Sequence, residues 1–250
     1  MNSRPTPEII AHRGFSVRAP ENTLSAMEAA IETGVESVEF DLRTAACGTP
    51  VLFHDPMLGR TTNGVGPLQR RPLAQLKALD AGSWFGSDFS GERIPTQREA
   101  LANLKGRVLR VYQEIKGYRE IEDLDRMVGI TRDAEMADAT VFLSSDWVIM
   151  NRLRSIAPEI QRAYLVETSF TFSEALDRAV VDEGSMLDME IGVAMENPGG
   201  VREALDAGVE VMAWTVDDPA EASAAVQLGI TRLTTNEVER LLVWRMGLTT

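Results

Sequence analysis

Short β-rich runs alternate with helical patterns along most of this 250-residue chain, and this alternation restricts the fold more than any other feature. A strand followed by a helix and a further strand is the repeating unit of a parallel sheet. The candidate strands are residues 8–13, 36–42, 50–54, 107–116, 139–145, 161–166, 185–191, 209–216 and 230–236. The candidate helices are residues 23–34, 98–106, 146–158, 172–184, 200–208 and 218–229. The pattern therefore predicts an α/β protein.

The third candidate strand, residues 50–54, does not fit the repeat. Only nine residues separate Asp41 from Val51, which is too few for a crossover helix of the usual length. We interpret it as an accessory strand folded over the mouth of a barrel, so that eight strands remain. Eight strands with intervening connections predict a closed (β/α)₈ TIM barrel, with an open doubly wound sheet as the alternative.

Residues 56–97 interrupt the alternation. This stretch is rich in turn residues and holds at most one short helix, "LAQLKAL". We expect a small insertion at the C-terminal face of the barrel, where such barrels carry their active-site loops. No other stretch has the composition of a linker, so residues 1–250 are expected to form one domain.

The composition limits the kinds of partner that the protein can bind. The formal net charge of −13 argues against nucleic acid and anionic membranes, since both require basic surfaces. Cys47 is the only cysteine, which excludes an intrachain disulfide and a cysteine-based zinc site. No run approaches the ~18 apolar residues of a membrane span, and "MNSRPTPE" lacks the apolar core of a signal peptide. We expect a cytoplasmic protein without a membrane span.

The chain has only two histidines, and both end strands. His12 follows the apolar run "EIIA", and His54 follows "PVLF". Histidine is the side chain whose ordinary pKa lies nearest neutrality, so a pair of them suits proton transfer in both directions. The sequence matches no helical two-histidine zinc motif, so we interpret His12 and His54 as candidate acid–base residues.

Carboxylates recur on one face of two strands. Glu39 and Asp41 are two residues apart, as are Glu114 and Lys116, so each pair points to one side of its strand. Carboxylates gathered in a barrel interior are costly unless a cation lies between them. Mg²⁺ or Ca²⁺ is the expected guest, because both ions prefer oxygen ligands. Lys116 would remain as a positive charge for an anionic substrate.

Two further residues suit a site for a phosphorylated small molecule. Arg13 follows His12 directly, and a guanidinium can bind a phosphate through two parallel hydrogen bonds. Trp214 lies near the end of a late strand, where it either lines a substrate or packs in the core.

Residues 241–248, "LLVWRMGL", are more apolar than a free tail should be. They are expected to dock on the barrel or on another subunit of a homo-oligomer.

Several motifs together resemble the glycerophosphodiester phosphodiesterase family, in its bacterial cytoplasmic type. They are "AHRG…PENTLSAMEAAIETGVESVEFDLR", "PVLFHD…GRTTNG", "GSWF…GERIPT", "QEIK" and "AWTV", in order along nearly the whole chain. The resemblance implies a (β/α)₈ barrel with an insertion after the second histidine. It also implies metal-dependent hydrolysis of a glycerophosphodiester to sn-glycerol 3-phosphate and an alcohol, by attack of water or through a cyclic phosphate.

The resemblance also implies roles for individual residues. By motif, the metal ligands would be Glu39, Asp41 and Glu114, and the acid–base pair His12 and His54. Arg13 and Lys116 would hold the phosphate, and Trp214 would line the glycerol side. Which histidine is the acid stays open at this point.

The chain departs from the family pattern at some positions. Cys47 stands where the family usually has Asp, and Asn236 stands where the family's last Asp is expected in "GITRLTTN". Ser145 is followed by Asp146 instead of Phe. The segment "SMLDMEI" places Asp188 and Glu190 on one face of a late strand; if that face lines the pocket, the released alcohol is cationic or rich in hydroxyl groups. The departures concern the substrate more than the reaction.

Two other functions remain as alternatives. A related barrel phosphodiesterase could act on a different phosphodiester, including lipid substrates in the manner of a phospholipase D, but the single cysteine and the acidic composition disfavour it. A non-catalytic barrel that binds phosphodiesters is less favoured, because every expected histidine and carboxylate is present.

Overall fold

The computed structural model describes residues 6–248 and confirms the predicted barrel. Its strands are β1 (Glu8–Ala11), β2 (Ser37–Thr44), β3 (Pro50–Leu52), β4 (Arg110–Ile115), β5 (Thr140–Ser144), β6 (Gln161–Val166), β7 (Met186–Glu190), β8 (Glu210–Trp214) and β9 (Arg232–Thr235). The sheet order is β1-β9-β8-β7-β6-β5-β4-β2-β3, and β1 also pairs with β2, which closes the barrel. The eight barrel strands are parallel, and only β3 is antiparallel, beside β2.

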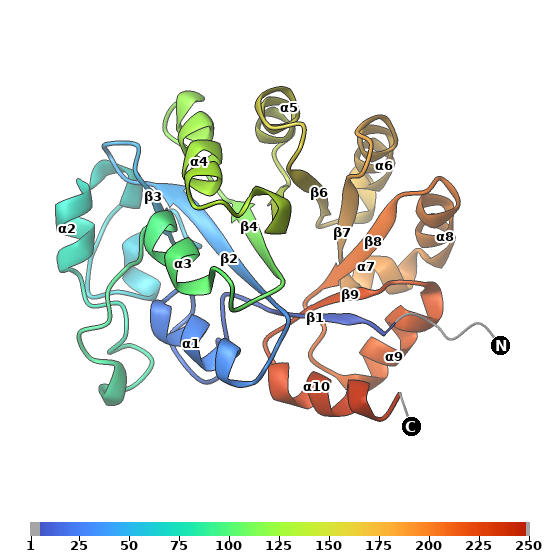
Figure 1. Ribbon diagram of the computed structural model, residues 1–250, viewed down its shortest axis with the longest axis horizontal. Helices are drawn as coiled ribbons and strands as arrows, with labels where there is room; N and C mark the ends of the chain where they lie inside the picture. The colour runs from blue at the N-terminus through green and yellow to red at the C-terminus, as the bar shows by residue number, and fades with distance from the viewer. Residues whose placement is uncertain (1–5, 249–250) are drawn as a thin grey trace.

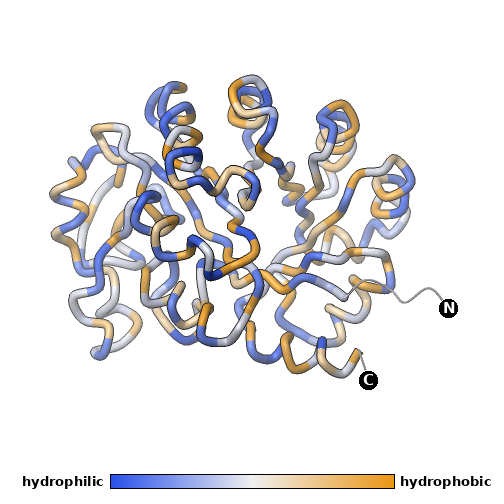
Figure 2. Tube along the Cα trace, viewed as in Figure 1, coloured by the Kyte–Doolittle hydropathy of each residue, from blue (hydrophilic) through white to orange (hydrophobic). Residues whose placement is uncertain are grey.

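Helices surround the strands (Figure 1). They are α1 (Leu24–Glu32), α2 (Leu73–Ala78), α3 (Gln97–Leu104), α4 (Glu122–Asp133), α5 (Trp147–Ile156), α6 (Phe172–Val181), α7 (Ile191–Glu196), α8 (Pro198–Asp206), α9 (Pro219–Leu228) and α10 (Val238–Met246). Hydrophobic and hydrophilic residues alternate along most of them, as Figure 2 shows. This is the pattern of helices that bury one face and expose the other.

Two apolar cores follow from the alternation of side chains along the strands. One core fills the barrel interior and contains Ile10, Tyr112, Leu143, Leu165 and Met212 among others. A much larger core lies between the sheet and the helices. The strand side chains that point away from the barrel interior contribute to this core. A side chain's parity therefore decides whether it faces the interior of the barrel or its helical shell.

The segment between β3 and α3 covers one side of the barrel, with α2 at the left of Figure 1. It holds α2 and three short 3₁₀ helices, at Leu58–Arg60, Leu68–Arg70 and Ser87–Phe89. Its apolar side chains pack with those of β3 in a separate small cluster. This cluster fixes the segment above β3, the strand that precedes His54.

Helix α10 docks on the barrel, which is the first of the two expected positions for the C-terminal apolar segment. Val238 and Leu241 are buried, and the indole nitrogen of Trp244 donates a hydrogen bond to Ser223. Arg245 forms an ion pair with Glu36 at 2.6 Å. A homo-oligomer formed through this region stays a prediction.

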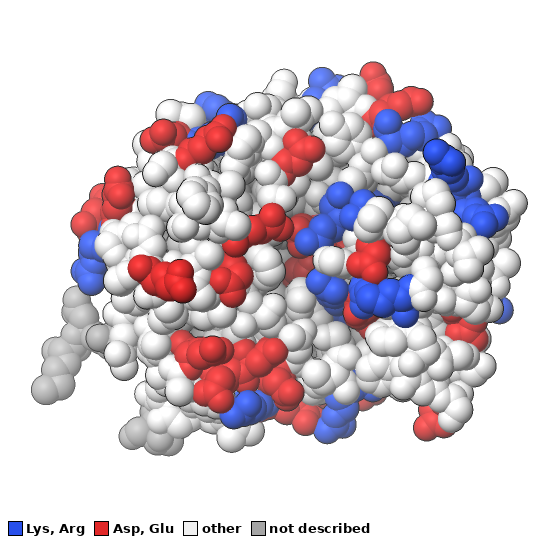
Figure 3. Space-filling model, turned by 180° about the vertical axis from the view of Figure 1, so that it is seen from behind, with Lys and Arg blue, Asp and Glu red and all other residues white. Residues whose placement is uncertain are grey.

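Charge is unevenly distributed over the surface. Figure 3 shows a group of acidic side chains near the C-terminal end of the described chain, whereas acidic and basic side chains lie beside one another around the middle of the same face. None of the helices in residues 6–248 is long and apolar enough to cross a membrane.

Candidate active site

Pairing of β2 with β4 brings the predicted carboxylates together. Asp41 lies directly opposite Glu114 in the register of the two parallel strands. Glu39 has the same parity as Asp41, and the residues between and beside them, such as Phe40, pack against the helices. All three carboxylates therefore enter the barrel interior at the C-terminal ends of adjacent strands.

The three carboxylates form one compact group. Glu39, Asp41 and Glu114 each offer an oxygen atom, and these atoms lie within 4.8 Å of one another. Burial and the two neighbouring carboxylates raise the pKa of Glu39 well above its ordinary value. Burial and Asp41 likewise raise the pKa of Glu114 to about 7. Such crowding of like charges is characteristic of a place built to hold a cation.

Two cationic side chains border the group. Lys116 Nζ lies 2.5 Å from Glu114 and 3.9 Å from Asp41, and Arg13 Nε lies 3.1 Å from Asp41. Burial opposes ionisation of Asp41, but Arg13 and Lys116 outweigh burial and lower its pKa. The site thus combines a carboxylate group with cations that an anionic substrate can approach.

The turn after β1 places Arg13 by an unusual backbone path. Arg13 has a φ of 58° and Gly14 a φ of 78°, and the Arg13 N–H donates to Glu39 at 2.9 Å. Asn22 also has a positive φ of 59°. Its side-chain amide donates to Asp41 Oδ2 at 2.7 Å and its oxygen accepts from the Asp41 N–H at 3.0 Å. The hydrogen bonds to Glu39 and Asp41 hold Arg13 and Asn22 in this left-handed conformation, which is costly for non-glycine residues.

His12 lies deep in the site. Its Nε2 is 3.9 Å from Glu39, and its Nδ1 is hydrogen-bonded to Asn236 at 2.7 Å. Burial and then the Arg13 guanidinium lower the pKa of His12 to about 4. The sequence alone did not point to Asn236 as a partner, because 224 residues separate the two.

His54 lies at the rim and has a different partner. Its Nδ1 is 2.6 Å from the carboxylate of Asp55. Arg60, from the segment after β3, donates to Asp55 at 2.5 Å and to both oxygens of Glu21 at 2.7 and 2.8 Å. Burial opposes ionisation of Asp55, yet hydrogen bonds from Arg60 and His54 lower its pKa to about 2. Asp55 therefore stays ionised and can orient His54.

A cavity of about 130 Å³ connects these groups. Its lining residues are His12, Arg13, Glu39, His54, Glu114, Lys116, Leu143, Glu167, Asp188, Trp214 and Thr234. Seven of the eight residues predicted for the site are among them. The eighth, Asp41, is fully buried and contacts Arg13 and Lys116. The structure thus brings the predicted residues together around one space.

The far wall of the cavity holds acidic groups that the sequence left undecided. Asp188 lines the cavity, and its buried Oδ1 has no hydrogen-bond partner. Burial and then Glu114 raise its pKa well above the ordinary value. Glu190 instead accepts the N–H of Val193 and caps α7. Glu167 at the end of β6 also lines the cavity, and no sequence pattern had singled it out.

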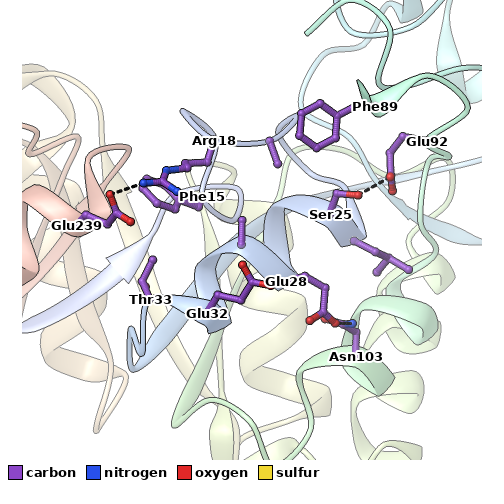
Figure 4. A pocket seen from close by; sticks show the side chains of 13 residues that line it. Phe15, Arg18, Ser25, Glu28, Glu32, Thr33, Phe89, Glu92, Asn103 and Glu239 are labelled. Atoms are coloured by element: carbon purple, nitrogen blue, oxygen red, sulfur yellow. Dashed lines mark hydrogen bonds and ion pairs between the residues drawn. The ribbon is translucent and has the colours of Figure 1, made fainter. Parts of the chain in front are cut away.

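A larger groove lies elsewhere, over α1. It has a volume of about 850 Å³, and Figure 4 shows Arg18 paired with Glu239 and Ser25 with Glu92 along it. It contains neither histidine. Within residues 6–248, the single group of side chains suited to a metal ion is the one at the smaller cavity. The smaller cavity is therefore the candidate active site.

Known proteins share this arrangement of fold and sequence. The model of the glycerophosphoryl diester phosphodiesterase family matches residues 12–240. A glycerophosphodiester phosphodiesterase of Caldanaerobacter subterraneus is 29% identical over 239 residues, covering 94% of this chain and 96% of the relative.

Solved structures agree with this result. A phosphodiesterase of Oleispira antarctica, in complex with the product sn-glycerol 3-phosphate, has a TM-score of 0.89 and 30% identity and covers 96% of both chains. A glycerophosphodiester phosphodiesterase of Agrobacterium tumefaciens has a TM-score of 0.81 and 28% identity, over 95% of this chain and 99% of that one. The chain belongs to the glycerophosphoryl diester phosphodiesterase family and is a phosphodiester hydrolase.

Proposed function

We propose that the protein cleaves glycerophosphodiesters to sn-glycerol 3-phosphate and an alcohol at the cavity between His12 and His54. The observation that carries the proposal is the meeting of two histidines, two cations and three carboxylates around one cavity. The product bound to the Oleispira antarctica relative supports glycerol 3-phosphate as the retained half of the substrate.

The carboxylates fit a divalent cation. Glu39 Oε1 and Asp41 Oδ1 are buried and have no hydrogen-bond partner, which is costly unless another group satisfies them. With Glu114 they form an all-oxygen set, and Mg²⁺ and Ca²⁺ both prefer such ligands. A cation bound there would neutralise the negative charge that grows on the phosphoryl oxygens.

The chain's own residues bind the substrate and move protons. Arg13 and Lys116 place positive charge beside the cavity and hold the phosphate. One histidine takes a proton from the attacking oxygen, and the other gives a proton to the departing alcohol oxygen. Trp214 lies half-buried on the cavity wall, where its ring can contact the carbon atoms of glycerol.

The segment after β3 belongs to the same unit in this proposal. Arg60 crosses from this segment to Glu21 beside α1, so residues 56–97 form an insertion within a single barrel domain that spans residues 1–250. The insertion holds Asp55 and, through it, His54.

The test measures glycerol 3-phosphate release from glycerophosphocholine with Mg²⁺ or Ca²⁺, before and after chelation. We expect release that stops with the chelator and returns when the ion is restored. Choline release from sphingomyelin, without glycerol 3-phosphate release from any glycerophosphodiester, would instead support the phospholipase D-like alternative. Glutamine at Glu39 should abolish the response to metal, whereas Glu174→Gln on the exposed face of α6 serves as the matched control.

Binding of the ion is also measurable without turnover. A ligand present at 100 times its Kd stabilises a folded protein by about 2.7 kcal/mol, which corresponds to roughly 5–10 °C in Tm for a domain of this size. We expect such a rise with Mg²⁺ or Ca²⁺, reversed by chelator and absent in Glu39→Gln. An unchanged Tm at millimolar ion would contradict the metal assignment.

A further inference from the structure

Asn236 connects His12 to a carboxylate outside the cavity. It follows the last residue of β9, and its Oδ1 lies 2.7 Å from His12 Nδ1. Its Nδ2 donates to Asp217 Oδ2 at 2.8 Å, and its backbone N–H donates to Asp217 Oδ1, also at 2.8 Å. One asparagine side chain is therefore held between an imidazole and a carboxylate.

The orientation of the Asn236 amide follows from Asp217. An ionised carboxylate only accepts hydrogen bonds, and the Oδ1 of Asp217 already accepts from the Asn236 N–H and from Thr235 Oγ1 at 3.0 Å. The amide nitrogen of Asn236 must then face Asp217, and its carbonyl oxygen must face His12. Ser16 Oγ donates to the same carbonyl oxygen at 3.2 Å, which agrees with this orientation.

The orientation of the amide decides where His12 carries its proton. A carbonyl oxygen cannot donate, so Nδ1 must be the donor in the His12–Asn236 hydrogen bond. A neutral imidazole with its proton on Nδ1 has its lone pair on Nε2. Nε2 is also the atom on the side of Glu39, at 3.9 Å, where the cavity lies.

We propose that Asn236, held by Asp217, is a positioning residue that keeps neutral His12 protonated at Nδ1, so that Nε2 is the proton acceptor of the reaction. The assignment rests on the proposed function, and it makes His12 the general base and leaves the acid role to His54. The His54 imidazole is oriented separately, by Asp55. Neither Asn236 nor Asp217 is itself among the residues that line the cavity, so both act through His12.

The position of the His12 proton is measured by NMR without any substrate. The chain contains only two histidines, so long-range ¹H–¹⁵N spectra of ¹⁵N-histidine-labelled protein show two imidazoles, assigned with His54→Gln. We expect His12 as the Nδ1–H tautomer at neutral pH, and a mixture with the Nε2–H tautomer in Asn236→Leu. An Nε2–H tautomer of His12 in the unmodified protein would overturn the proposal. A His12 that stays entirely in the Nδ1–H tautomer in Asn236→Leu would also overturn it, even if the enzyme is fully active.

Kinetics test the consequence for catalysis. Loss of a group that orients a reacting residue typically costs about 10–100-fold in activity. We expect Asn236→Leu to lower kcat by about that factor while KM for glycerophosphocholine changes less than about threefold. Asn151→Leu, on the exposed surface of α5, is the matched control and should leave both constants unchanged. Normal kcat in folded Asn236→Leu would overturn the proposal.

A double variant keeps the proposal testable if leucine disturbs folding. Asn236→Asp alone places two carboxylates in contact and should lose activity. Adding Asp217→Asn restores a donor facing an acceptor, and the carboxylate introduced at position 236 again accepts from His12 Nδ1. We expect the double variant to recover kcat and the Nδ1–H tautomer relative to the single variant. A double variant no better than Asn236→Asp would overturn the proposal.

Absence of turnover in the unmodified protein with every phosphodiester would instead count against the proposed function. The tautomer measurement would still decide the role of Asn236.

Discussion

At the scale of single residues, the two histidines share a reaction but not an environment. His12 is deep in the barrel and bonded to an amide, whereas His54 lies at the rim and is bonded to a carboxylate. A charged partner stabilises an imidazolium more than a neutral partner does. The difference suits one histidine that receives a proton and another that supplies one.

Removal of either imidazole is the first prediction at this scale. His12→Ala and His54→Ala should each lower turnover of glycerophosphocholine by at least about 10²–10⁴-fold, because each side chain carries a proton transfer. Circular dichroism and Tm should stay close to those of the unmodified protein. A near-normal rate in either folded variant would contradict the assignment.

Asp188 provides a prediction about the substrate. Its carboxyl group faces the cavity with an unpartnered oxygen, and a hydrogen bond to such a group contributes about 1.5–3 kcal/mol. Asp188→Asn should therefore reduce the preference, in kcat/KM, for glycerophosphoethanolamine over a glycerophosphodiester with an apolar alcohol by about tenfold or more. Glu190→Gln, on the same strand but capping α7, is the control. Equal preference in Asp188→Asn and unmodified protein would assign Asp188 another role.

At the scale of elements, the turn between β1 and α1 shows how the site is built. Gly14 has a φ of 78°, and a Cβ at this position would lie 2.6 Å from the backbone carbonyl carbon of Ala26 in α1. Helix α1 therefore packs directly against the turn that carries Arg13. Thr23 fixes the start of that helix by accepting the N–H of Ala26.

This packing leads to a prediction about stability. Gly14→Ala should lower the free energy of unfolding by more than about 2 kcal/mol, because left-handed strain and a backbone clash add. Gly34→Ala is the matched control, since Gly34 has a φ of 76° but nothing within 4 Å of a Cβ. That variant should lose only the ~1–2 kcal/mol of left-handed strain. Equal losses in urea unfolding would exclude the clash.

Most elements agree with the sequence prediction, and the differences have local causes. Helix α4 was not predicted. Its first turn is acidic, with Glu122, Asp123 and Asp125, and its apolar stripe is short, with Leu124, Met127 and Val128 buried. Helix α7 begins at Ile191, which the sequence placed in the preceding strand. A β-branched residue after a strand fits either a strand or a helix locally. The cap by Glu190 makes Ile191 the first residue of the helix.

At the scale of the whole molecule, a buried ion pair joins β6 to the loop between α6 and β7. Arg162 on β6 donates to both oxygens of Asp182 at 2.7 and 2.8 Å, and Tyr164 donates to the same carboxylate at 2.9 Å. Both charged side chains are under 5% exposed. Removing one partner from such a pair commonly costs about 3–5 kcal/mol.

The pair predicts how the fold responds to acid. Burial opposes ionisation of Asp182, but Arg162 outweighs burial and lowers the pKa of Asp182. The pKa in the folded protein therefore lies below the ~3.9 of an unfolded chain. The ionised carboxylate therefore stabilises the fold above about pH 4, and this contribution is lost as pH falls through the folded pKa. Asp182→Asn should be less stable at pH 7 and should lose less further stability below pH 4, measured by urea unfolding. A parallel acid response in both proteins would exclude Asp182 as its cause.

Sequence alone determined the alternation of strands and helices, the parity of each strand and the residue types at the strand ends. These are local properties, because period and parity depend on neighbours within a few residues. From them followed the barrel, which the structure confirms, and the eight candidate site residues, whose roles stay predictions.

Only the tertiary structure decided which of these side chains meet, and through which partners. Closure between β1 and β2, the register that opposes Asp41 to Glu114, and the bond from His12 to Asn236 all join residues far apart in the chain. The same holds for Asp188, which lines the cavity while Glu190 caps a helix. Such contacts depend on how whole elements pack, and packing is a property of the folded chain that no local window of residues contains.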